Sequence, residues 1–174
     1  AGISDLIIAG DLFNSDGDDS AYSSFLEPCR RHPGIRIHLL PGNHDSEKSL
    51  RDLQFDQLIK YTHTRIVDFA GISFLFIPYQ SGKSMSGELD LISDKLWEKP
   101  LCIVGHGDFI DGQRVPNPRE KGVYMPLKKG DLSCPNLLKV FLGHIHKPTP
   151  INQSLGGKVI YPGSPQGLDI SETG

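Results

Sequence analysis

The stretch Val140-Phe141-Leu142-Gly143-His144-Ile145-His146 joins an apolar run of strand length to a glycine and two histidines. Three other runs end in glycine followed by a residue able to bind metal, namely Ile7-Ile8-Ala9-Gly10-Asp11, Leu39-Leu40-Pro41-Gly42-Asn43-His44-Asp45 and Cys102-Ile103-Val104-Gly105-His106. In open α/β sheets the functional crevice lies beyond the carboxyl ends of the strands, and glycine there lets the backbone turn sharply. The repetition predicts one site where four strand ends meet.

Short apolar runs bounded by glycine or proline recur along the chain and are typical of strands. They cover residues 6–9, 35–40, 64–69, 72–77, 101–104, 139–142 and 158–161. Helix-like stretches lie between them, near residues 21–31, 47–60 and 90–99. This alternation predicts the α/β class. Only Ala70-Gly71 separates the third run from the fourth, which indicates a β-hairpin and therefore an antiparallel element in the sheet.

The length and composition fit one globular domain. The chain has 174 residues, of which 37% are hydrophobic and 22% charged, and no segment approaches the roughly 18 uninterrupted apolar residues of a membrane span. We therefore expect no membrane partner. A net charge of −3 argues against a generic polyanion binder held by bulk charge. The three cysteines are widely spaced and form no Cys-x-x-Cys pair, which argues against disulfides and against a thiolate zinc site. The N-terminal residues do not resemble a signal peptide, so we expect a cytoplasmic protein.

The residues after the glycines form a mixed oxygen and nitrogen ligand set. A carboxylate, an amide oxygen and three imidazoles suit Mn, Fe or Zn better than Ca or Mg. Asp11 has two oxygens with which to bridge two ions, and His144 and His146, two residues apart in extended chain, point the same way and can each serve one ion. Two ions about 3.5 to 4 Å apart are the usual arrangement for phosphoester hydrolysis, in which activated water attacks phosphorus in line.

In this order, the four motifs resemble those of the calcineurin-like metallophosphoesterase family over nearly the whole chain. The resemblance implies a two-sheet β-sandwich flanked by helices and two divalent metal ions, with Mn the leading choice. It makes Asp11 the bridging ligand, and it makes Asn43, His106 and His144 ligands of one ion and His146 a ligand of the other.

The same resemblance assigns the acid-base chemistry to the Asn-His-Asp motif. It makes His44 the proton donor to the leaving oxygen, with Asp45 orienting it. The chemistry agrees, because an imidazole beside two cations can stabilise or protonate a departing alkoxide. An alternative role for Asp45 is a turn carboxylate that caps the helix beginning near Glu47.

Within the family, the chain is most similar to SbcD-like nuclease subunits of DNA double-strand-break repair. This similarity rests on three segments, Gly10-Asp11-Leu12-Phe13, Leu142 to Pro148, and Tyr161-Pro162-Gly163-Ser164-Pro165-Gln166-Gly167-Leu168-Asp169 leading to Glu172. It implies a DNA exonuclease or phosphodiesterase with an SMC-like ATPase partner. The Gly-Ser-Pro segment is expected at the edge of the metal site, where backbone amides can meet a phosphate.

Two features depart from that pattern. The Asp-x-His motif with which the family opens is missing from this sequence, so either its strand precedes Ala1 or the site is incomplete. Asn14 stands where relatives often carry His or Asp.

The segment from Gly107 to Gly130 is too long for an ordinary connector and predicts a functional loop over the site. Its basic residues either face solvent or contact the phosphates of a nucleic acid, and they are Arg114, Arg119, Lys121, Lys128 and Lys129. A groove along it favours DNA, whereas a closed pocket favours a phosphatase or phosphodiesterase for small molecules or phosphoproteins. A non-catalytic scaffold that has lost one metal is a third reading. His32, His38 and His63 lie outside every motif and are expected at the surface or at helix ends.

Overall fold

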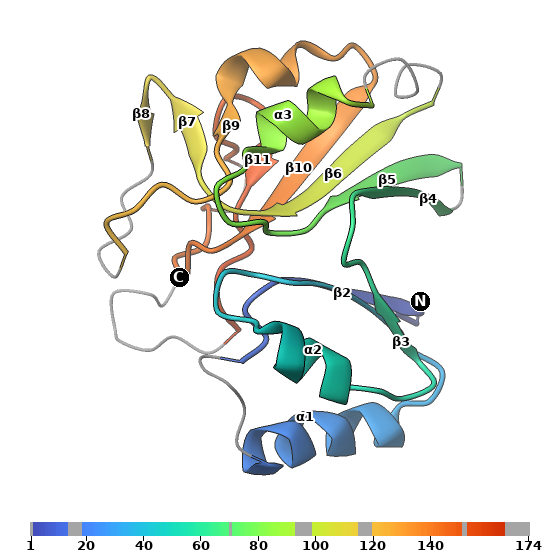
Figure 1. Ribbon diagram of the computed structural model, residues 1–174. Helices are drawn as coiled ribbons and strands as arrows, with labels where there is room; N and C mark the ends of the chain where they lie inside the picture. Colours follow the sequence, from blue (N-terminus) through green and yellow to red (C-terminus); the bar gives the residue numbers. More distant parts are fainter. Residues whose placement is uncertain are drawn as a thin grey trace.

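The computed structural model describes residues 2–13, 19–69, 71–92, 99–114, 120–150 and 153–165. Two larger sheets face each other, a small third sheet stands beside one of them, and helices cover their outer faces (Figure 1). The α/β sandwich flanked by helices is confirmed. None of the helices in these ranges is long and apolar enough to cross a membrane.

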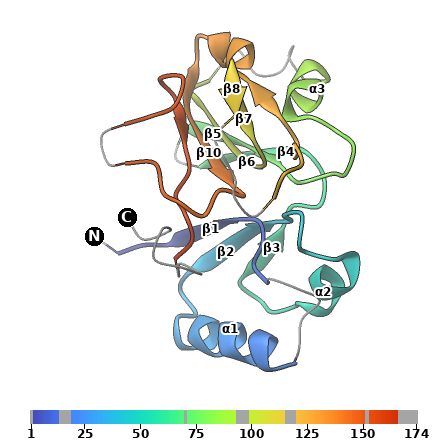
Figure 2. The same ribbon diagram turned by 90° about the vertical axis from the view of Figure 1, so that its left-hand side faces the viewer.

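The first sheet is built from parallel strands joined by helices. Its order is β1 (Asp5–Ala9), β2 (Arg36–Leu40) and β3 (Leu58–Lys60), with the register Asp5 opposite Arg36. The connecting helices α1 (Asp19–Arg31) and α2 (Glu47–Asp52) lie on the face turned away from the second sheet (Figure 2). A core of Phe13, Leu39 and Leu53, with Phe25 and Leu26 of α1 packed against it, holds these helices in place.

The second sheet has five strands. Its order is β11 (Val159–Ile160), β10 (Leu137–Gly143), β6 (Leu101–His106), β5 (Ile72–Ile77) and β4 (Arg65–Phe69). Only β4 runs antiparallel to its neighbour, so the predicted hairpin between β4 and β5 is confirmed. The short helix α3 (Met85–Asp90) packs Met85 into the core of this sheet.

The two larger sheets meet through apolar and aromatic side chains. Leu40 from β2 and Tyr61 after β3 form one cluster with Phe76 of β5 and Val104 of β6. The rings of Tyr61 and Phe76 stack with centroids 3.9 Å apart. Burial of such rings is a large favourable term in folding, so this contact fixes how one sheet sits on the other.

The segment expected to be a loop over the site contains regular structure at both ends. The third sheet has the order β8 (Gln113–Arg114), β7 (Phe109–Asp111) and β9 (Leu127–Lys128), and a 3₁₀ helix, η2 (Lys129–Ser133), follows it. Phe109, Met125 and Leu127 are buried in the core of the second sheet. Apolar residues therefore anchor both ends of the segment, and Arg119 lies outside the described residues.

One predicted helix is longer than the observed one. Residues 47–60 were expected to be one helix, but α2 ends at Asp52, Leu53 is extended with φ −76° and ψ 101°, and residues 58–60 pair with β2 as β3. Of the helix expected over residues 90–99, residues 93–98 lie outside the described part; α3 ends at its first residue, Asp90. Apolar spacing alone did not separate a helix from a helix followed by a strand.

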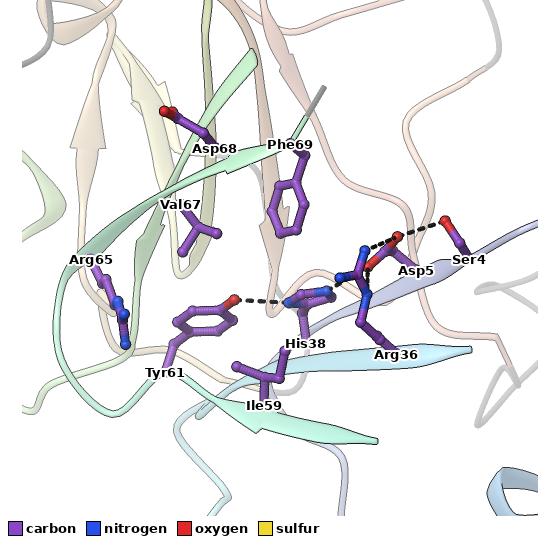
Figure 3. A pocket seen from close by; sticks show the side chains of 10 residues that line it. All are labelled: Ser4, Asp5, Arg36, His38, Ile59, Tyr61, Arg65, Val67, Asp68 and Phe69. Atoms are coloured by element: carbon purple, nitrogen blue, oxygen red, sulfur yellow. Dashed lines mark hydrogen bonds and ion pairs between the residues drawn. The ribbon is translucent and has the colours of Figure 1, made fainter. Parts of the chain in front are cut away.

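His38 is also placed differently from expectation, since its side chain is only 2% exposed. It lies in the wall of a pocket of about 510 Å³ that is lined by residues of the first sheet and of β4 in the second (Figure 3). Its Nε2 lies 2.9 Å from Asp5 Oδ1 and its Nδ1 lies 2.8 Å from Tyr61 Oη. His32 and His63 are exposed, as predicted.

Candidate metal centre

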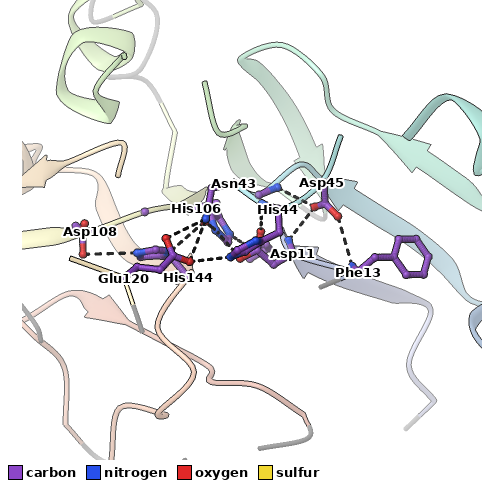
Figure 4. A network of polar contacts seen from close by, with 12 residues as sticks. Asp11, Phe13, Asn43, His44, Asp45, His106, Asp108, Glu120 and His144 are labelled. Carbon is purple, nitrogen blue, oxygen red and sulfur yellow. Dashed lines mark hydrogen bonds and ion pairs between the residues drawn. The ribbon is translucent and has the colours of Figure 1, made fainter. Parts of the chain in front are cut away.

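Four strand ends bring their motif residues together at the junction of the two sheets (Figure 4). Asp11 follows β1 and Asn43 follows β2, both in the first sheet, whereas His106 ends β6 and His144 follows β10 in the second. Parallel strands that end at one edge aim the residues after them into one space, as the sequence pattern predicts.

Glycine makes this close approach feasible. A Cβ on Gly143 would collide with the carbonyl oxygen of Ala9, and a Cβ on Gly42 would collide with the carboxylate of Asp11. Only a residue without a side chain lets the two backbones come so near. Asp11 and His144 themselves have positive φ angles of 52° and 90°, an unusual conformation for residues other than glycine, of the kind that concentrates at functional sites.

The donor atoms of these residues converge. One ligand atom each from Asp11, His106 and His144 lies within 4.8 Å of the other two. Asn43 Oδ1 lies 2.8 Å from His106 Nε2 and 3.1 Å from His144 Nδ1. A carboxylate, an amide oxygen and two imidazoles around one point fit a divalent transition metal.

A hydrogen bond to the backbone fixes the tautomer of the His106 ring. Its Nδ1 lies 2.7 Å from the carbonyl oxygen of Ala9, which only accepts, so Nδ1 carries the proton. The lone pair of Nε2 then points at Asn43 and at Asp11, whose Oδ2 is 3.2 Å away. This is the tautomer that a metal ligand requires.

The pKa values favour the ligand forms of two side chains. Burial works to raise the pKa of Asp11, but His106 and the backbone N–H of His44 outweigh it, and the pKa lies below its usual value. Burial, together with the neighbouring His106, lowers the pKa of His144. An ionised Asp11 and a neutral His144 are the forms that bind a cation.

His44 and Asp45 lie beside this cluster with separate partners. The His44 backbone N–H donates to Asp11 Oδ1 at 2.9 Å, and its ring Nε2 lies 2.7 Å from Glu120 Oε1. The carboxylate of Asp45 accepts the backbone N–H groups of Gly42 at 2.9 Å and Asp11 at 2.8 Å. Burial raises the pKa of Asp45. These bonds tie the loops after β1 and β2 together, and the partner of the His44 ring is Glu120.

The alternative role for Asp45, as the cap of α2, belongs to another residue. Ser46 is the N-cap, and its side chain accepts the N–H of Ser49. Serine is a preferred residue at this position because its oxygen replaces a missing helix acceptor.

His146 is half-buried and is not a member of the cluster of Asp11, His106 and His144. Its backbone oxygen accepts the N–H of Ser164 at 2.8 Å, so the Gly-Ser-Pro segment lies alongside the histidine motif. The Ser164 amide is used in this contact rather than turned to a phosphate. Asn14 and the run from Gln166 to Glu172 lie outside the described residues.

Three residues of the site lie outside the motifs found in the sequence. Asp108 is fully buried, with Oδ1 3.9 Å from His144 Nε2 and Oδ2 accepting the N–H of Tyr124 at 2.8 Å. The ring of Tyr124 packs 4.8 Å from that of His144. Glu120 accepts from Asn43 and His44, and although burial works to raise its pKa, these bonds and one from Tyr124 lower it overall. Asp108 could have been suspected from the sequence, because it lies two residues after the motif residue His106. No feature of the sequence pointed to Glu120 or Tyr124.

Comparison with known proteins agrees with this geometry. No curated protein matches the chain. A family model, described as calcineurin-like phosphoesterase, matches residues 2–148, which include every candidate ligand and candidate acid-base residue of the site. Since the match covers far more than half of the sequence, this chain belongs to the calcineurin-like phosphoesterase family.

Proposed function

We propose that this domain is a dinuclear metal-dependent phosphodiesterase that acts on DNA as an exonuclease. The observation that carries the proposal is the convergence of Asp11, Asn43, His106 and His144 from four strand ends. Family membership supports metal-dependent phosphoester hydrolysis. The DNA substrate, Mn as the metal and an SMC-like ATPase partner rest on the similarity to SbcD-like subunits.

The side chains divide into holding and proton-transfer roles. Asp11, Asn43, His106 and His144 would hold one ion, with Asp11 shared by a second ion that His146 serves. Such ions act as Lewis acids at phosphoryl oxygens and activate water. His44, whose side chain is 41% exposed and whose backbone N–H donates to Asp11, would donate the proton to the leaving oxygen. Asp45 holds together the loops that carry Asp11 and Asn43, because its carboxylate accepts the backbone N–H groups of Asp11 and Gly42.

Exposed lysines on the segment between β7 and η2 support a nucleic-acid substrate. Lys121, Lys128 and Lys129 are all exposed, and Lys129 Nζ pairs with Asp111 Oδ1 at 3.0 Å. Cations near a phosphodiester site position a nucleic-acid backbone without reading its sequence.

The test combines metal content with activity. Purified protein would be assayed for bound Mn, Fe and Zn, and then for hydrolysis of end-labelled DNA beside bis-p-nitrophenyl phosphate. Two metals per chain with DNA cleavage, lost in His44→Ala, are expected. Activity on the small diester alone would replace the nuclease with a small-substrate phosphodiesterase or phosphatase. Metal-free protein without turnover would mean a non-catalytic scaffold.

A further inference from the structure

Glu120 contacts two motif residues, Asn43 and His44, that are expected to have different chemical roles. It lies in the segment between β8 and β9, outside all four strand-end motifs. Its Oε1 lies 2.7 Å from His44 Nε2, and both of its oxygens lie 3.1 Å from Asn43 Nδ2. Its side chain is only 16% exposed. One carboxylate therefore contacts an expected metal ligand and the expected proton donor at once.

The contact with Asn43 determines which end of the amide faces the metal cluster. An ionised carboxylate accepts hydrogen bonds and donates none, so the Asn43 group beside Glu120 is the NH₂. The amide oxygen is then turned to His106 Nε2 and His144 Nδ1, at 2.8 and 3.1 Å. Without Glu120, nothing among these contacts would favour the oxygen over the nitrogen at that position.

The contact with His44 fixes a proton and a ring orientation. Because Glu120 accepts, His44 Nε2 carries hydrogen and donates, so a proton given to the leaving oxygen would come from Nδ1 of the ring. The His44 side chain is 41% exposed, so packing alone leaves it room for other rotamers. A short bond to a largely buried carboxylate holds the ring on the side of the metal cluster.

Tyr124 anchors Glu120 in turn. Its hydroxyl donates to the Glu120 carboxylate, its ring packs 4.8 Å from His144, and its backbone N–H donates to Asp108. The carboxylate is thus attached to the second-sheet side of the site while it contacts two residues of the first-sheet side.

We propose that Glu120 is a positioning residue that presents the Asn43 oxygen to the metal and orients His44 for proton donation. The part that concerns His44 rests on the proposed phosphodiesterase function, whereas the part that concerns Asn43 requires only metal binding. Carboxylates and other groups that orient metal ligands typically contribute 10–100-fold to metal affinity.

The first arm of the test measures metal binding without catalysis. Mn²⁺ would be titrated calorimetrically into wild-type protein, Glu120→Gln and the control Glu27→Gln, whose carboxylate pairs with Arg31 on the surface of α1. We expect roughly 10- to 100-fold weaker binding in Glu120→Gln and wild-type binding in the control. Unchanged affinity in a folded Glu120→Gln protein, checked by circular dichroism, would overturn the role through Asn43.

The second arm compares leaving groups. p-Nitrophenyl thymidine 5′-phosphate releases an anion that needs little protonation, whereas thymidylyl-thymidine releases an alkoxide that needs an acid. With saturating Mn²⁺, Glu120→Gln should lower kcat for the dinucleotide at least several-fold more than kcat for the p-nitrophenyl ester. In a His44→Ala background, Glu120→Gln should not change the ratio of the two kcat values further. Equal losses on both substrates would overturn the role through His44. If the wild type binds Mn²⁺ but hydrolyses neither substrate, the proposed function fails and the His44 role fails with it, while the first arm still decides the role through Asn43.

Discussion

Gly143 and Gly42, which precede the candidate ligands His144 and Asn43, are not needed for a sharp turn. Neither residue is among the glycines with positive φ in the described chain. What each provides is room, because a Cβ would meet Ala9 at one position and Asp11 at the other. A glycine motif can therefore mark the contact between two backbones as well as a turn.

Replacing Gly143 by alanine is expected to destabilise the fold. The added methyl would meet the Ala9 carbonyl and would also lie 2.8 Å from His106 Nδ1. Overpacking of this kind typically lowers the free energy of unfolding by about 1–3 kcal/mol. Urea denaturation would measure it, with Gly34→Ala as the matched control, since a Cβ there has nothing within 4 Å. Equal stability of the two variants would contradict the spacing argument.

His44 and Asp45 are neighbours, but their alanine variants should fail differently. His44→Ala should reduce kcat by about 10²–10⁴ with little change in stability, because general acids contribute that much and this ring is exposed. Asp45→Ala should also lower the free energy of unfolding by about 1–3 kcal/mol, because it removes the acceptor of the Gly42 and Asp11 N–H groups. Kinetics and thermal unfolding of both variants would distinguish them. An Asp45→Ala protein of wild-type stability would contradict the structural role of these two hydrogen bonds.

At the scale of elements, the sequence predicted strands better than helices. Glycine and proline bound each apolar run, so the strand ends and the residues after them could be placed. The helix expected over residues 47–60 failed because pairing with β2, a contact distant in sequence, makes residues 58–60 a strand. Glu120 could not be predicted, since its place depends on how the segment between β7 and β9 folds back over the site. His38 was missed because its polar partners come from other elements of the chain.

Three segments of the first sheet are linked by the Asp5, His38 and Tyr61 side chains, and this link should depend on pH. Hydrogen bonds from Arg36, Ser4 and His38 lower the pKa of Asp5 below its usual 3.8. A carboxyl whose pKa is lower in the folded state stabilises the fold above the unfolded pKa and loses that contribution as pH falls toward the folded one. The stability difference between wild type and Asp5→Asn should therefore be constant near neutral pH and shrink below about pH 4. Guanidinium denaturation across that range would show it, and a difference independent of pH would contradict it.

For the whole molecule, the candidate metal centre lies at the junction between two sheets, each with its own hydrophobic core. Asp11 and Asn43 belong to the first sheet, with its own cluster around Leu39, whereas His106 and His144 belong to the second. A cation bound among them would link the two sheets more strongly than packing alone. Stability of the whole domain should then depend on the concentration of metal.

Metal should accordingly raise the melting temperature. At a free Mn²⁺ concentration of 100 times Kd, binding to the folded state alone contributes about 2.7 kcal/mol. Differential scanning calorimetry with and without Mn²⁺ would test this, using His106→Ala to remove a ligand and exposed His63→Ala as the control. Stabilisation retained in His106→Ala would place the ion elsewhere.

The candidate ligands are far apart in the sequence, which determines when the site can form during synthesis of the chain. The first sheet and its two helices are encoded within residues 5–60, so their contacts are local and can form while the ribosome is still adding the remainder. The bonds that complete the centre join residues 97 and 101 positions apart, His106 to Ala9 and His144 to Asn43. A nascent chain that has only its first half carries two of the four candidate ligands, Asp11 and Asn43. If the four residues bind a cation, its uptake would report that the second half has docked on the first.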